Sequence, residues 1–113
     1  MKDKLLNIGE SLMTYYLDRV AHQTLLGTYS RALEARKVVL LPEGGWEGKN
    51  VGEREAARDR IYAEDQILIN LQTKLQDAQN NLLLTEANIQ GLEAVRRSLE
   101  WVIRLMEATN AAN

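Results

Sequence analysis

Residues 61–106 read IYAEDQILINLQTKLQDAQNNLLLTEANIQGLEAVRRSLEWVIRLM and carry a seven-residue repeat that decides the fold. Counted in sevens from Ile61, and again three residues later in each heptad, the repeat selects fourteen positions, of which eleven are apolar. These positions are Ile61, Leu68, Leu75, Leu82, Ile89, Arg96 and Ile103, and Glu64, Leu71, Ala78, Thr85, Leu92, Leu99 and Met106. Polar residues follow every member of the second set, as in a coiled coil. The repeat predicts one long helix over about 50–110, in which Gly91 is the weak point at about 1 kcal/mol relative to Ala.

Helix-breaking residues precede this helix. Pro42, the only proline, disfavours helical backbone at the residue before it, and three glycines follow within six residues. Asn50 can then accept a hydrogen bond from the Glu53 amide while the Glu53 side chain reaches back to the Asn50 amide, which makes a capping box. We therefore expect a loop over about 42–49 and a helix start at Asn50.

The residues before the loop show the same repeat less cleanly. Eight of its eleven positions are apolar: the set is Leu5, Leu12, Arg19, Leu26, Leu33 and Leu40, with Ile8, Tyr15, His22, Tyr29 and Arg36. We expect a helix over about 3–41, either continuous or broken around 22–28. The predicted fold class is all-α: a single domain over 1–113, folded as an antiparallel helical hairpin with a long C-terminal coiled-coil helix, in an oligomeric bundle.

The predicted helix lengths suggest self-assembly. Helices of about 39 and about 61 residues differ by roughly 30 Å, so the last ~20 residues of the second helix lack a partner within the chain. A monomer would leave their apolar stripe in water. We therefore expect a homo-oligomer, and the alternative is a monomer whose first helix bends back on itself. The expected oligomer interface consists of Ile89, Leu92, Val95, Leu99, Val102, Ile103 and Met106.

The composition excludes several classes of function. The 113 residues contain no Cys and one His, which excludes disulfides, thiolate metal sites, cysteine nucleophiles and poly-histidine sites. The formal net charge of −2 does not favour a surface that coats nucleic acid, although a local patch stays open. No apolar run approaches the ~20 residues that span a bilayer, and no signal-peptide core opens the chain. We expect a cytoplasmic protein, with no membrane contact, cofactor or metal.

Two sets of residues are candidates for catalysis. His22 lacks a recognisable nucleophile and orienting acid, so we favour a half-buried His that hydrogen-bonds across the seam. Carboxylates pair at Glu64 and Asp65 and again within 53–59, as in all-α nucleotide pyrophosphatases that bind Mg²⁺. The first helix has no second acidic cluster, so we favour a solvated face with ion pairs. A Mg²⁺-dependent nucleotide hydrolase is the least favoured function, and we expect no enzyme activity.

Trp46 stands on the glycine-rich turn among charges of both signs. In one interpretation, Lys49, Arg54 and Arg58 bind a phosphate backbone while Trp46 stacks on a base. The helix start at Asn50 would add amide donors for an anion. In the other interpretation, ion pairs hold the end of the hairpin together and Trp46 folds over the seam.

Trp101 lies off the heptad stripe, with Arg97 four residues before it and Arg104 three residues after it. On a helix, these three side chains share one face. An exposed Trp between two guanidinium groups suits a nucleotide, single-stranded nucleic acid or an acidic protein surface. The alternative is that Trp101 packs in the oligomer contact and the arginines cover its ring.

Three segments carry a resemblance to known proteins: YSRALEARKVVL at 29–40, GKNVGEREAA at 48–57 and LEWVIR at 99–104. Over about 12–106, the chain resembles small helical proteins from the early regions of tailed phages and prophages. A looser likeness is to the helical recombination mediator of T-even phages, which loads a recombinase on single-stranded DNA. The resemblance implies an oligomeric accessory protein in DNA recombination or replication that binds single-stranded DNA or a partner protein. It also implies that the protein acts in the cytoplasm of a bacterial host cell. The alternative is an inhibitor that sequesters a host enzyme, a defence protein or a nucleotide signal.

Overall fold

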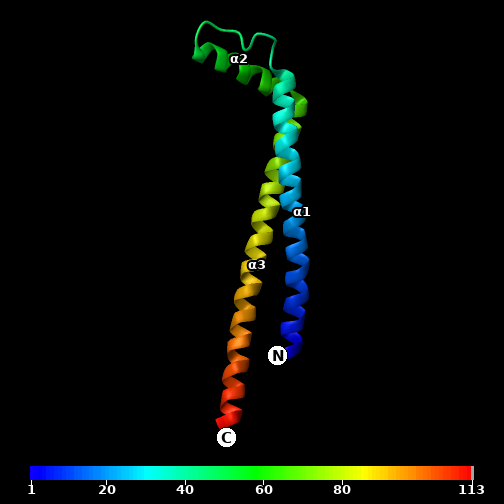
Figure 1. The fold of residues 1–113 in the computed structure, drawn as a ribbon, viewed down its shortest axis with the longest axis vertical. Helices are drawn as coiled ribbons and strands as arrows, with labels where there is room; N and C mark the ends of the chain where they lie inside the picture. Colours follow the sequence, from blue (N-terminus) through cyan, green and yellow to red (C-terminus); the bar gives the residue numbers. More distant parts are fainter. Residues whose placement is uncertain (113) are drawn as a thin grey trace. The chain divides into compact units, whose positions relative to one another are not determined.

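The computed structural model describes residues 1–112, and in these residues every regular element is an α-helix. The helices are α1 (Lys2–Leu40), α2 (Val51–Glu64) and α3 (Gln66–Ala112), and only Asp65 separates α2 from α3. The fold is therefore an all-α antiparallel helical hairpin with a long C-terminal helix, as predicted. Figure 1 shows α1 and α3 as its two long helices.

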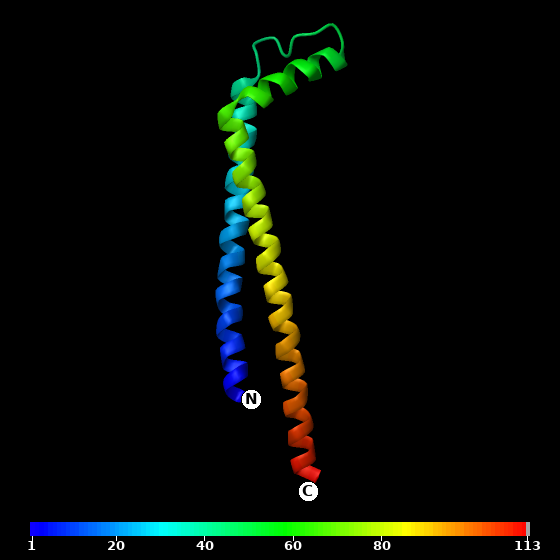
Figure 2. The ribbon, with the colours of Figure 1, turned by 180° about the vertical axis from the view of Figure 1, so that it is seen from behind.

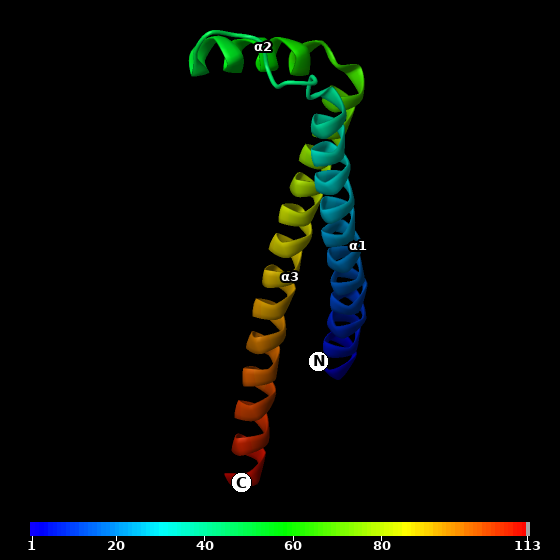
Figure 3. The same cartoon turned by 45° about the horizontal axis from the view of Figure 1, so that its top comes forward.

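The helices divide between two compact units. The first unit contains Met1–His22 and the chain from Asn81 onward, and the second contains Gln23–Asn80. In the second unit, the end of α1 lies beside the start of α3, and α2 leads away from both (Figures 2 and 3). The loop between α1 and α2 belongs to this second unit.

The predicted heptad stripes form the core of each unit. The most buried side chains of the described residues all occupy stripe positions: Leu12 and Leu33 on α1, and Leu68, Ala78, Thr85 and Ile89 on α3. Both helices therefore bury one narrow line of side chains, as the coiled-coil repeat requires. Their remaining surfaces stay accessible.

Helix α1 runs without interruption through residues 22–28, so the structure answers the question that the sequence left open. Gly27 is half-buried inside the helix, and the Arg31 guanidinium lies 3.3 Å from the place a Cβ would take. One interior glycine costs about 1 kcal/mol relative to Ala, which a long packed helix tolerates. Arg19, a polar stripe residue, lies 5.2 Å from the centroid of the Tyr16 ring.

The prediction of a single helix over about 50–110 is wrong at one residue. Asp65 has φ −83° and ψ 109°, an extended conformation, so α2 ends at Glu64 and α3 begins at Gln66. The heptad register continues across this break, because Ile61 and Leu68 remain seven residues apart. Hydrophobic periodicity therefore gives no sign of it. The available signal is the Asp itself, a strong N-cap residue whose side chain competes with helical hydrogen bonds.

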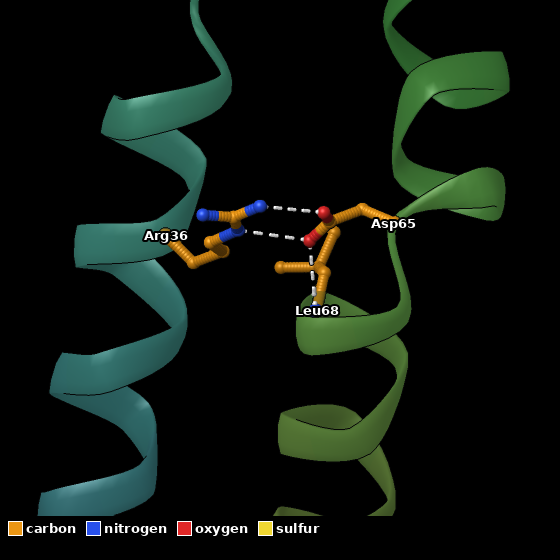
Figure 4. Close-up of polar contacts among 3 residues, drawn as sticks. All are labelled: Arg36, Asp65 and Leu68. Carbon is orange, nitrogen blue, oxygen red and sulfur yellow. Dashed lines mark hydrogen bonds and ion pairs between the residues drawn. The ribbon is translucent and has the colours of Figure 1, made fainter.

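Asp65 is held from three directions, two of which Figure 4 shows. Its Oδ2 accepts the Leu68 N–H at 2.9 Å, which caps the start of α3. Its own N–H donates to the Ile61 carbonyl at 3.1 Å, which closes the last turn of α2. Arg36 of α1 donates from Nε to Oδ2 at 2.9 Å and from Nη2 to Oδ1 at 2.7 Å. This bidentate pair fixes the end of α1 at the helix break.

The break removes most of the predicted overhang. Helix α1 has 39 residues and α3 has 47. At 1.5 Å per residue these lengths differ by about 12 Å, where the sequence predicted roughly 30 Å. In the first unit, Met1 and Lys2 line a pocket together with Ile103 and Met106. The N-terminal end of α1 thus lies beside the C-terminal part of α3. The sequence analysis expected that part of α3 to lack a partner within the chain.

We predict that Asp65→Asn lowers the melting temperature at pH 7 and weakens its dependence on acidic pH. The hydrogen bonds from Arg36 lower the pKa of Asp65, desolvation opposes them, and the Leu68 amide adds a smaller lowering. Because the folded pKa lies below the unfolded value of about 3.9, the ionised carboxylate stabilises the native state above that value. This contribution is lost as the pH falls through the folded pKa. Thermal unfolding followed by circular dichroism at pH 7 and in steps below pH 4 measures both effects.

Glu64→Gln is the matched control for this experiment. Glu64 is exposed, and its side chain makes no hydrogen bond or ion pair with any residue in the described range 1–112. Its substitution should leave the melting temperature and the pH profile close to those of the original chain. Asn keeps the capping oxygen, so Asp65→Asn tests the charge. A pH profile identical to that of the original chain would refute the role of the ion pair.

Candidate functional site

The loop–α2 end, residues 41–64, carries the first set of predicted binding residues. The Asn50 Oδ1 accepts the Glu53 N–H at 2.9 Å, and the Glu53 Oε2 accepts the Lys49 N–H at 2.6 Å. The capping box is therefore confirmed at the predicted helix start, with one difference: the Glu53 carboxylate takes the amide of Lys49 and not that of Asn50. Gly48, with φ +146°, turns the backbone so that this amide faces the carboxylate.

Trp46 packs against α2. It is half-buried, and its ring meets the Tyr62 ring edge to face at 5.6 Å and 89°. On Tyr62, the Lys37 ammonium lies 5.9 Å from the ring centroid. Trp46 also lines a pocket of about 220 Å³ with Pro42, Glu47, Ala57, Arg60 and Ile61. This geometry matches the interpretation in which Trp46 folds over the end of the hairpin better than an open stacking platform.

The charges of the loop–α2 end are mixed. Residues 43–64 hold four Lys or Arg and six Asp or Glu. Arg58 pairs with the neighbouring Asp59 at 3.1 Å, and the Arg54 Nε donates to the Asn50 carbonyl at 3.3 Å. Lys49 is exposed. A local excess of carboxylates opposes the binding of a phosphate backbone at this end.

The carboxylates do not gather into a metal site. Within residues 1–112, no group of three or more His, Asp or Glu side chains is placed to hold a metal ion. Asp65, one member of the acidic pair noted in the sequence, is engaged by Arg36 at 2.7 Å. Among these carboxylates, Asp59 and Asp65 form ion pairs, and Glu53 and Asp65 take part in helix capping.

The polar contact between the two helices of the first unit comes from Tyr16 and not from His22. The Tyr16 hydroxyl donates to the Glu93 Oε1 at 2.7 Å, and this hydrogen bond, followed by desolvation, raises the pKa of Tyr16. His22 is half-buried, and its Nδ1 is enclosed without a hydrogen-bond partner among the described residues. The predicted hydrogen bond across the seam is therefore not made by this nitrogen. Tyr16 lies off the heptad stripe, so periodicity gave no sign of its role.

The Trp101 patch, defined as Arg97, Trp101 and Arg104, lies on the solvent-exposed side of α3. The indole is 61% exposed, and both arginines are exposed. Among residues 1–112, neither Arg97 nor Arg104 forms an ion pair. Two of the neighbouring carboxylates have other partners, since Glu93 accepts from Tyr16 and Glu100 lies 3.9 Å from Arg96. The patch thus offers one aromatic ring and two unpaired guanidinium groups to an anionic partner.

The residues predicted for the oligomer interface separate into two groups. Ile89 is 3% exposed within the chain, and Leu92, Leu99 and Ile103 are half-buried. These four side chains face the intrachain seam, and their contact with another copy stays a prediction. Val95, Val102 and Met106 are 48%, 40% and 50% exposed. These three residues of the predicted interface remain exposed within the chain.

No protein-family model, curated protein or solved structure matches the chain. Within residues 1–112, no helix combines the length and apolar character needed to cross a membrane. We therefore infer function from the two surfaces described above.

We predict that Gly48→Ala raises the hydrogen-exchange rates of the first-turn amides of α2 by about tenfold or more, which corresponds to ~1.4 kcal/mol. A Cβ on Gly48 would lie 2.7 Å from the Arg54 nitrogen and 2.8 Å from the Glu53 Cβ, so the capping box would have to open. Hydrogen exchange followed by NMR measures the change at each amide.

Gly44→Ala is the control for this substitution. Gly44 also has positive φ, at +84°, but nothing lies within 4 Å of the position that a Cβ would take there. Alanine at this residue carries backbone strain of about 1 kcal/mol and no collision. Equal exchange rates in the two variants would show that the close approach at Gly48 does not hold the cap.

Proposed function

We propose that the chain is a non-enzymatic accessory protein that binds single-stranded nucleic acid through the Trp101 patch, in DNA recombination or replication. The observation that carries the proposal is the exposed indole, 61% accessible, between two arginines that have no ion-pair partner in residues 1–112. The resemblance to early-region phage proteins supports the same setting. It also supports a bacterial host cell as the place where the protein acts.

The chemistry of the patch suits an unstacked strand. Arginine pairs with phosphate oxygens through a planar fork of N–H donors, and an indole stacks on any base. Arg97 and Arg104 are seven residues apart, so they are separated by about 10 Å along the helix axis. Trp101 lies between them on the same face. Two phosphate contacts with a base stacked between them make a binding unit that reads no particular sequence.

The loop–α2 end supports this function less well. Its carboxylates outnumber its cations six to four between residues 43 and 64. Trp46 is half-buried against Tyr62, and Arg58 is paired with Asp59. We therefore place the binding of the strand at the Trp101 patch.

The double substitution Arg97→Gln and Arg104→Gln should weaken the binding of a fluorescent single-stranded DNA oligonucleotide by roughly tenfold or more, because two charge-assisted phosphate contacts are lost. The affinity of the original chain should also fall as salt rises, with a shallower slope in the variant. Fluorescence anisotropy at several salt concentrations measures both quantities.

A Trp46→Phe chain leaves Trp101 as the only indole, and its fluorescence should be quenched when the oligonucleotide binds.

Arg31→Gln is the matched control, because Arg31 is an exposed arginine in the other unit of the chain. It removes one positive charge and should change the affinity little. Binding that is insensitive to salt, or unaffected by the double substitution, would contradict the proposal. A third outcome would favour an inhibitor of a host protein. In that outcome, the chain does not bind the oligonucleotide, and it forms a stoichiometric complex with a protein of the host lysate that survives nuclease treatment.

A further inference from the structure

Helix α3 carries a long exposed face without charge. From Leu84 to Thr109, twelve residues follow one another at spacings of three, one and three, the pattern of a single helix face. This uncharged face consists of Leu84, Ala87, Asn88, Gly91, Ala94, Val95, Ser98, Trp101, Val102, Leu105, Ala108 and Thr109. All twelve are exposed, and eight of them are apolar. The face has the composition of a second helix-packing seam that nothing in the described chain covers.

The charged residues of the same segment lie elsewhere on the helix. They are Glu86, Glu93, Arg96, Arg97, Glu100, Arg104 and Glu107. Successive side chains are rotated by about 100° around the helix axis. The charged residues therefore cluster between the intrachain seam and the side that carries Trp101. The centre of the uncharged face lies roughly 120° around the axis from the seam. An acidic or basic partner would find no complementary group on this face. Its occupant must itself be uncharged and apolar.

Gly91 gives an independent indication of a close partner. It lies in the interior of α3, where glycine costs about 1 kcal/mol relative to alanine. Nothing lies within 4 Å of the position that a Cβ would take there, so no contact within the described chain requires glycine. A glycine in the middle of an apolar face permits the close approach of another helix.

The chain as a whole exposes more surface than a compact monomer of its mass, and the excess is larger than one partner's share of a dimer interface. The chain exposes 8313 Å². A compact monomer of the same mass exposes about 6300 Å², so the excess is roughly 2000 Å². A standard interface buries only about 800 Å² on each partner. Under two-fold symmetry, the large side chains of the face would also lie opposite its small or polar ones.

We infer that the uncharged face binds the same face of a second copy, with the two α3 helices antiparallel about a two-fold axis between Arg96 and Arg97. This arrangement pairs a large side chain with a small or polar one at every layer. The pairs are Leu84 with Thr109, Leu105 with Asn88, Val102 with Gly91, and Val95 with Ser98. A parallel arrangement would instead put glycine beside glycine and leucine beside leucine, which alternates voids with collisions.

The dimer also deepens the proposed function, and this consequence alone rests on that function. In an antiparallel pair, equivalent flanking positions of the two helices lie on the same side. Trp101 of each copy then lies beside the small Ala94 of the other. The two Trp101 patches are about 14 Å apart along the helix axis, since nine residues separate their levels. One side of the dimer therefore presents two indoles and four arginines to a strand.

Disulfide trapping tests the arrangement directly, because the chain has no cysteine of its own. Asn88→Cys and Leu105→Cys are made as separate chains and oxidised alone and as an equimolar mixture. The antiparallel dimer places these two residues opposite each other, whereas each is about 26 Å along the axis from its own copy. The mixed disulfide should therefore be the main product of the mixture, and neither chain alone should cross-link. Leu17→Cys, 64% exposed on α1, should cross-link with none of them.

Each outcome of the trapping experiment decides the proposal. Efficient cross-linking of either cysteine chain with itself would overturn the antiparallel arrangement. An absence of product, together with a monomer mass in sedimentation of the unmodified chain, would overturn the dimer.

As a second variant, Val95→Lys with Val102→Lys should weaken dimerisation by roughly a hundredfold, because two charges of each copy would be desolvated without partners. Leu17→Lys is the control, and dimerisation unchanged by the double lysine variant would exclude this face.

The same measurements separate the dimer from nucleic-acid binding. Sedimentation is carried out without nucleic acid, so a failure of the Trp101 patch to bind DNA leaves its result unaffected. Arg97→Gln with Arg104→Gln should dimerise like the original chain, since both arginines lie outside the uncharged face. A loss of dimerisation in this variant would show that the two surfaces are not separate.

Discussion

The hydrogen bonds of Asp65 are the constraint on which the rest of the structure depends. This residue ends α2 and caps α3, and Arg36 holds it through a bidentate pair at 2.9 and 2.7 Å. If the helix continued through it, the apolar repeat would form one helix of about 61 residues, and α1 could cover only part of it. Because the helix stops, 14 residues form α2 and 47 form α3, close in length to the 39 residues of α1.

This match in length determines which surface of α3 is left for other molecules. Ile89 is buried inside the chain, and its neighbours Leu92, Leu99 and Ile103 on the heptad stripe are half-buried. What remains is the charged side, the Trp101 patch and the uncharged face. The last two adjoin at Trp101, so the proposed dimer and the proposed binding of an anionic strand would both involve this indole.

The sequence predicted the features that depend on near neighbours and on period. The loop, the capping box at Asn50 and the buried stripe through Leu68 and Ile89 are all where the pattern put them. Periodicity is insensitive to a one-residue break that keeps the register, which is why Asp65 was missed. Periodicity also identifies which residues share a helix face, but it does not show which face packs against another helix of the same chain. The repeat therefore places the predicted oligomer interface on and beside the seam, and it gives no sign of the exposed uncharged face.

The backbone conformation of Asp65 in solution is the most direct test of this dependence. Carbon-13 secondary chemical shifts of the Cα and Cβ atoms, measured by NMR across residues 60–70 of the full chain, distinguish helical from extended backbone residue by residue. We expect helical shifts in α2 up to Glu64 and in α3 from Gln66 onward, with an extended value at Asp65. Uninterrupted helical shifts through Asp65 would contradict the central claim, because α3 would then be too long for α1 to cover.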